Sequence, residues 1–68
     1  MNANEVRKAI RAGMGYTGHT QCELARKMGI SEDTLRRKLR NPEGLTLGEL
    51  IAADNAVRWT AFVKEEGK

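Results

Sequence analysis

Four of the five residues from 36 to 40 are cationic, and two carboxylates stand just ahead of them. The cations are Arg36, Arg37, Lys38 and Arg40, and the carboxylates are Glu32 and Asp33. Guanidinium groups form paired hydrogen bonds with phosphate and with the edge of guanine, and carboxylates accept from the amino group of cytosine. The same carboxylates can instead pair along a helix, Glu32 with Arg36 and Asp33 with Arg37. The sequence leaves both roles open.

A tight turn precedes this charged segment. Gly29 can adopt the left-handed conformation that ends a helix, Ala25 is small enough for two helices to approach, and Ile30 can fill the angle between them. Ser31 can then cap a helix over 32–40, after a helix over 21–28. Residues 21–40 are therefore predicted to form a helix-turn-helix.

The predicted second helix has an apolar and a charged side. Leu35 and Leu39 are four residues apart and fall on one stripe, which we expect to face the core. Arg36, Arg37 and Arg40 then point outward. We predict that Arg36 and Arg37 read bases, because an α-helix fits the major groove of DNA. Lys38 and Arg40 lie further along the helix, where contact with phosphate is expected.

The remaining elements are predicted from caps and apolar spacing. Thr20 and Thr46 begin Thr-x-x-Glu capping boxes, which open the helix over 21–28 and another over 47–56. The free amides at residue 21 favour an anion, so Gln21 is predicted to bind phosphate and Thr20 to add a hydroxyl contact. Apolar residues at 6, 10 and 14 predict a first helix over 4–15, followed by a loop over 15–18. Thr60 predicts the cap of a last helix over 61–66.

Length and composition indicate one small all-α domain covering residues 1–68. The net charge is +3, and residues 1–42 hold nine Lys or Arg against four Asp or Glu. No apolar run approaches the roughly 20 residues of a membrane span, and the start has no signal-peptide pattern. A single cysteine, Cys22, fits a reducing cytoplasm. No metal constellation, phosphate-cradling glycine loop or nucleophile–base pair is present in the sequence, so we expect no cofactor and no enzyme.

A longer stretch resembles a known family. Residues 19–60 read HTQCELARKMGISEDTLRRKLRNPEGLTLGELIAADNAVRWT. The strings around TQCELARKMGIS, TL and TLGEL are similar to those of the lambda-repressor-like (Cro/Xre-type) regulators of phages and bacteria. The resemblance covers about residues 5–63. Three features depart from the family pattern: His19 replaces a hydrophobe, Lys38 replaces an apolar residue, and Glu32 and Asp33 replace neutral or basic residues.

The resemblance implies a compact four- to five-helix domain that binds a double-stranded DNA operator, commonly as a homodimer. It also implies that the Gln21 side chain contacts phosphate and that the second helix of the motif reads bases. Phe62 and Val63 are either core residues or dimer contacts. We therefore expect a sequence-specific regulator of Cro or mini-repressor type, acting by operator occlusion in the cytoplasm of a bacterial host, without a small-molecule ligand.

Two other functions stay open. The acidic Glu32 and Asp33 and the net charge of −2 over residues 43–68 are also compatible with a protein-interaction module on the same fold, such as an antitoxin-like or polymerase-binding phage factor. A DNA-architectural or recombination accessory protein shares the DNA prediction. The salt dependence of binding distinguishes a DNA-binding from a protein-binding function, because the affinity for DNA falls more steeply with salt for each phosphate that the protein neutralises.

Overall fold

Four α-helices and two short 3-10 helices make up the computed structural model, which describes residues 2–63. They are α1 (Ala3–Thr17), α2 (Gln21–Met28), α3 (Glu32–Arg40), η1 (Pro42–Gly44), α4 (Leu47–Val57) and η2 (Trp59–Phe62). The described part contains no strand, so the prediction of an all-α chain is confirmed. None of the helices in this part is long and apolar enough to cross a membrane.

Polar caps fix where α2, α3 and α4 begin. Thr20 and Thr46 each accept the amide N–H of the glutamate three residues later, and that glutamate, Glu23 or Glu49, accepts the N–H of its threonine in return. The Ser31 hydroxyl accepts the N–H of the third residue of α3 at 3.1 Å. Each contact satisfies a first-turn amide that has no partner within the helix. The predicted starts of these three helices are confirmed.

The end of α1 differs from the prediction. The helix continues to Thr17, so the loop predicted over 15–18 is wrong except for its last residue, Gly18. The Thr17 hydroxyl donates to the carbonyl of Gly13 at 2.8 Å, which stabilises the last turn. Gly18 then adopts φ 78° and donates its N–H to the Met14 carbonyl, and this closes the helix.

The segment after α4 also differs from the prediction. Instead of a helix capped by Thr60 over 61–66, the chain forms η2 (Trp59–Phe62), and Val63 after it is extended. The Thr60 hydroxyl and N–H both donate to a carboxylate oxygen of Asp54, at 2.7 and 3.1 Å. The threonine is therefore bonded back to α4, and it lies within η2 and not ahead of a helix start, where a cap would stand. The rest of the predicted helix, 64–66, lies outside the described residues.

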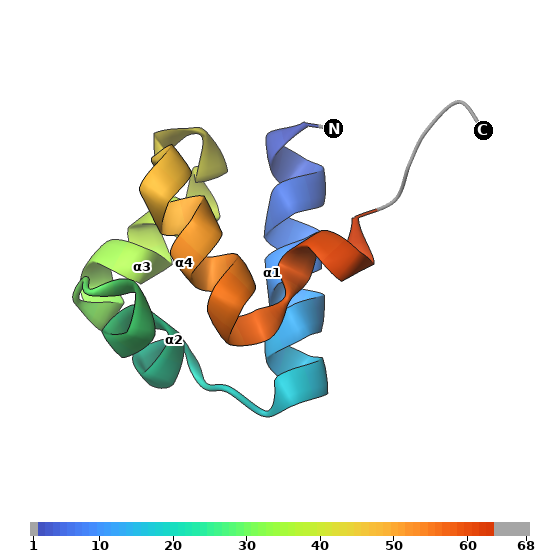
Figure 1. The fold of residues 1–68 in the computed structure, drawn as a ribbon. Coiled ribbons are helices and arrows are strands. Elements are labelled where there is room, and N and C mark those ends of the chain that lie inside the picture. Colours follow the sequence, from blue (N-terminus) through green and yellow to red (C-terminus); the bar gives the residue numbers. More distant parts are fainter. Residues whose placement is uncertain (1, 64–68) are drawn as a thin grey trace.

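One apolar core joins all four α-helices and η2. Its buried members are Ala9, Ile10, Leu24, Ala25, Leu35, Leu39, Ala53, Val57 and Trp59. Helix α1 packs against η2 and α4, and α2 packs against α3 and α4, so α4 lies between the two halves (Figure 1). The Trp59 indole is buried, and its N–H donates to the Leu50 carbonyl at 2.9 Å, which ties η2 to α4 within the core.

Candidate functional site

The turn between α2 and α3 has the geometry that the sequence predicts. Gly29 adopts φ 76° and donates its N–H to the Arg26 carbonyl at 3.1 Å, while Ile30 donates to the Ala25 carbonyl at 3.0 Å. These two bonds form a Schellman motif, which ends a helix and reverses the chain within a few residues. Ala25 is buried and Ile30 is partly buried against the core. The orientation of α3 relative to α2 is thereby fixed.

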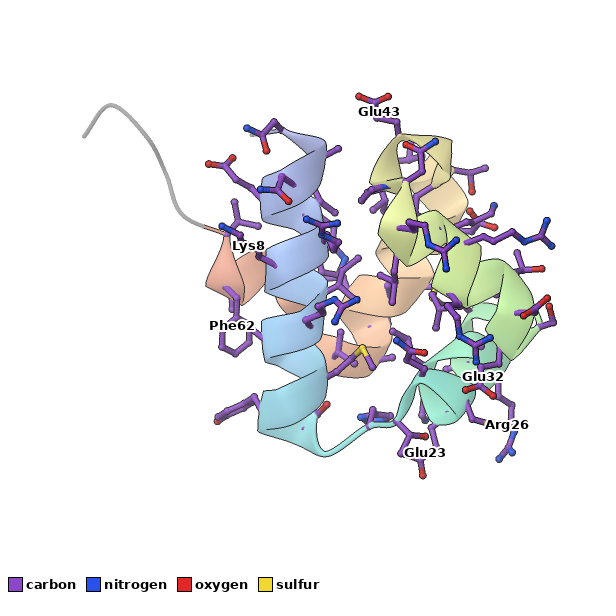
Figure 2. The ribbon with its side chains drawn as sticks, turned by 180° about the vertical axis from the view of Figure 1, so that it is seen from behind. Lys8, Glu23, Arg26, Glu32, Glu43 and Phe62 are labelled. Carbon is purple, nitrogen blue, oxygen red and sulfur yellow. The ribbon has the colours of Figure 1, made fainter. Side chains whose placement is uncertain are left out.

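Helix α3 turns its leucines inward and its charges outward. Leu35 and Leu39 are 0% and 1% exposed. The exposed residues of α3 are Glu32, Asp33, Arg36, Arg37 and Arg40. The predicted inward side of the two leucines and outward side of the three arginines are therefore confirmed. In Figure 2, Glu32 at the start of α3 and Arg26 on α2 lie at the same side of the molecule, opposite Phe62.

Arg36 is paired with both carboxylates at the start of α3. Its guanidinium lies 3.5 Å from Glu32 and 3.1 Å from Asp33. Of the two pairs that the sequence left as one of its alternatives, Glu32 with Arg36 is present, whereas Asp33 pairs with Arg36, three residues ahead, and not with Arg37. All three side chains are substantially exposed, so these contacts are worth at most about 1 kcal/mol each. They leave Arg36 easily available to another anion.

Arg37 and Arg40 form no ion pair with any of residues 2–63. Three exposed arginines and two carboxylates therefore share the outer face of α3, which leaves it with one net positive charge. The most available cations of this face are Arg37 and Arg40, because the guanidinium of Arg36 is paired with its two acidic neighbours.

Lys38 is held by α4. Its ammonium donates to both carboxylate oxygens of Glu49, at 2.7 and 2.8 Å. The two side chains are only 24% and 16% exposed, far less than the pairs of Arg36. The hydrogen bond from Lys38, followed by that from the Thr46 backbone, lowers the pKa of Glu49 below its ordinary value. Lys38, which the sequence assigned to phosphate, thus already has an anionic partner.

The start of α2, at the end of this helix away from the turn, presents a second polar group. Gln21 is half-buried, and Thr20 is occupied as the cap of the helix. The Thr20 N–H donates to Glu23 at 2.9 Å, and this hydrogen bond lowers the pKa of the Glu23 carboxyl. An anion at this helix end would meet the Gln21 side chain and the amides that the capping box does not use.

Of the two residues proposed as core or dimer contacts, Phe62 lies away from α3. Phe62 is 37% exposed, and its ring lies 5.8 Å from that of Tyr16, centroid to centroid. Val63 is partly buried against the core. Figure 2 shows Phe62 beside α1, on the side of the molecule opposite Glu32. A partner docked on Phe62 would therefore leave the arginines of α3 uncovered.

Sequence reasoning missed the bond between Lys38 and Glu49. The spacing indicates only where Lys38 lies: it follows the buried Leu35 by three residues and so falls on the flank of the apolar stripe, but nothing in the spacing names Glu49 as its partner. The part of the chain that the structure describes holds no group of His, Cys, Asp and Glu suited to a metal ion.

The fold and site define a small all-α domain that exposes the charged face of a short helix beside a tight turn. No protein-family model, curated protein or solved structure matches the chain. What the protein does is therefore inferred from its own geometry and charges.

Proposed function

We propose that the chain is a helix-turn-helix domain of the lambda-repressor-like type that binds double-stranded DNA sequence-specifically and regulates transcription. The observation that carries the proposal is the hydrogen-bonded turn at Gly29, after which α3 lies with Leu35 and Leu39 in the core and its arginines outward. A helix presented in this way can enter the major groove while the preceding helix crosses the backbone.

The exposed side chains of α3 divide by position. Arg36 and Arg37 lie in the middle of the helix and are assigned to base edges, with Glu32 and Asp33 either accepting from cytosine or holding Arg36 extended. Arg40, at the end of the helix, is assigned to phosphate. Gln21 and Thr20 at the start of α2 are assigned to phosphate as well, where amides and the helix dipole favour an anion.

The regulatory mechanism that we propose is occlusion of an operator. Two copies related by a two-fold axis would place their α3 helices about one turn of DNA apart and so bind a palindrome. Phe62 and Val63 are proposed as contacts between the copies, since Phe62 is exposed on the side away from α3. Such a dimer would act in the bacterial cytoplasm by covering a promoter.

The experiment that tests this function is selection of random double-stranded DNA by the purified protein, followed by sequencing of the bound pool. The expected result is a palindromic motif containing guanines whose selection is lost in Arg36→Ala or Arg37→Ala, each costing about 1–3 kcal/mol. Lys27→Ala, a change of an exposed cation on α2, is the matched control and should keep the motif. A folded protein that enriches no motif at moderate salt would refute the proposal.

One observation favours a second candidate, a protein-interaction module on the same fold. Both carboxylates at the start of α3 engage Arg36, which leaves little net charge to attract a polyanion. The two candidates differ in salt dependence: DNA binding weakens with a log–log slope of about −0.9 per phosphate contact. A protein complex that persists at high salt, without DNA enrichment, would favour the second candidate.

A further inference from the structure

The bond between Lys38 and Glu49 has a special place in the fold. Within residues 2–63 it is the only side-chain hydrogen bond or ion pair that joins α3 to α4. The two residues are eleven positions apart in the chain. The backbone of α3 packs mainly against α2 and η1. Side chains therefore make most of the contact between α3 and α4.

Glu49 is held from two directions. Its carboxylate accepts the Thr46 N–H at 2.9 Å as part of the capping box of α4, and at the same time it accepts Lys38. The capping box therefore holds the carboxylate at the first turn of α4 independently of Lys38. Because both side chains are mostly buried, water and salt screen this pair less than the exposed pairs of Arg36.

We propose that Lys38 is a positioning residue, which fixes the rotation of α3 about its own axis and does not bind phosphate. The leucines of α3 hold it to the core through contacts that have little directional preference. The charge-assisted bonds to Glu49 are directional, and they set where Arg37 and Arg40 point. The consequence for DNA rests on the proposed function, whereas the link between the helices does not.

Glu49→Gln is the variant that separates positioning from phosphate binding. It removes the charge that holds Lys38 and keeps an oxygen for the capping box. If Lys38 positions α3, this variant loses about tenfold in the ratio of specific to non-specific DNA affinity, the loss expected for one charge-assisted hydrogen bond. If Lys38 binds phosphate, freeing its ammonium instead makes all DNA bind more tightly.

Lys38→Met gives the complementary measurement. The positioning role predicts the same loss of selectivity as Glu49→Gln, an unchanged salt slope, and no further loss in the double variant. Lys38→Arg, unlike Lys38→Met, should keep the selectivity of the wild-type protein, because a guanidinium can also pair with the carboxylate of Glu49. Arg40→Met is the comparison for a phosphate contact and should reduce the slope by about 0.9. A slope reduced equally by Lys38→Met would overturn the proposal.

A measurement without DNA keeps this proposal separate from the proposed function. In a double-mutant cycle of urea unfolding, Lys38→Met and Glu49→Gln should each lower the midpoint, and their combination should lower it by less than the sum. Backbone amide shifts of residues 32–40 should move in the same direction in both variants. If wild-type protein selects no DNA but these couplings appear, only the proposed function fails. Additive midpoints and unshifted amides would overturn the positioning role.

Discussion

Gly13 on α1 packs directly against Val57 at the end of α4, and replacing it tests how tightly the two helices are packed. A Cβ at this position would lie 2.5 Å from the carbonyl oxygen of Val57 and 3.1 Å from a methyl carbon of the same residue. Because the nearer atom belongs to the backbone, a side-chain rotation cannot relieve the contact. We therefore expect Gly13→Ala to force the end of α4 away from α1.

The expected size of the effect follows from two opposing contributions. Overpacking of this kind costs about 1–3 kcal/mol, and alanine in place of glycine within a helix returns about 1 kcal/mol. The contact with a backbone atom argues for the upper part of the cost, so the net loss should be about 1–2 kcal/mol. For a domain of this length such a loss lowers the melting temperature by roughly 4–16 °C.

Gly15 provides a matched control in the same helix. A Cβ there would have no heavy atom within 4 Å, and the residue is exposed near the end of α1. Gly15→Ala should therefore raise the free energy of unfolding by about 0.5–1 kcal/mol. Urea unfolding followed by circular dichroism compares the two variants. If Gly13→Ala proved as stable as Gly15→Ala, the close approach of α1 to Val57 would be refuted.

Three further predictions concern pH, the core and assembly. The lowered pKa values of Glu49, hydrogen-bonded by Lys38, and of Asp54, hydrogen-bonded by Thr60, mean that these carboxylates stabilise the fold fully above about pH 5 and progressively less as the pH falls through their ordinary range near 4. Melting curves between pH 6 and pH 3 should show this fall, and Glu49→Gln should make it shallower; an unchanged profile would contradict the assignment. Leu35→Ala, which empties a fully buried site, should cost about 2–5 kcal/mol in urea unfolding, and a cost below 1 kcal/mol would place this residue outside a close-packed core. Phe62→Ser should weaken self-association measured by sedimentation, whereas Ile51→Ser, at another exposed apolar residue, should not; the reverse order would exclude Phe62 as the contact.

The sequence was sufficient wherever local chemistry decides the structure. Hydroxyl caps at Thr20, Ser31 and Thr46 determine where three helices begin, and Gly29 determines where α2 ends. The end of α1 was not predictable in this way, because glycines at 13, 15 and 18 each offer a stopping point. The hydroxyl of residue 17 and the left-handed turn after it decide between them.

Contacts between distant residues account for the other differences. The residues next to Thr60 predict that it caps a helix. In the structure, its hydroxyl and its N–H instead donate to Asp54, six residues earlier in the chain. On α3, the 100° periodicity correctly separates the buried leucines from the exposed arginines. The same periodicity does not show that Lys38 meets Glu49, since that contact depends on how two helices are packed.

The buried indole of Trp59 gives the protein an internal fluorescent reporter. It is the single tryptophan of the chain, it is 5% exposed, and its N–H is bonded to the carbonyl of Leu50. Its emission should lie at short wavelength in the folded protein and shift to the red when the contact between α4 and η2 opens to water. Unfolding of this chain can thus be followed through the emission of Trp59, which reports on the core without a label and without a substitution.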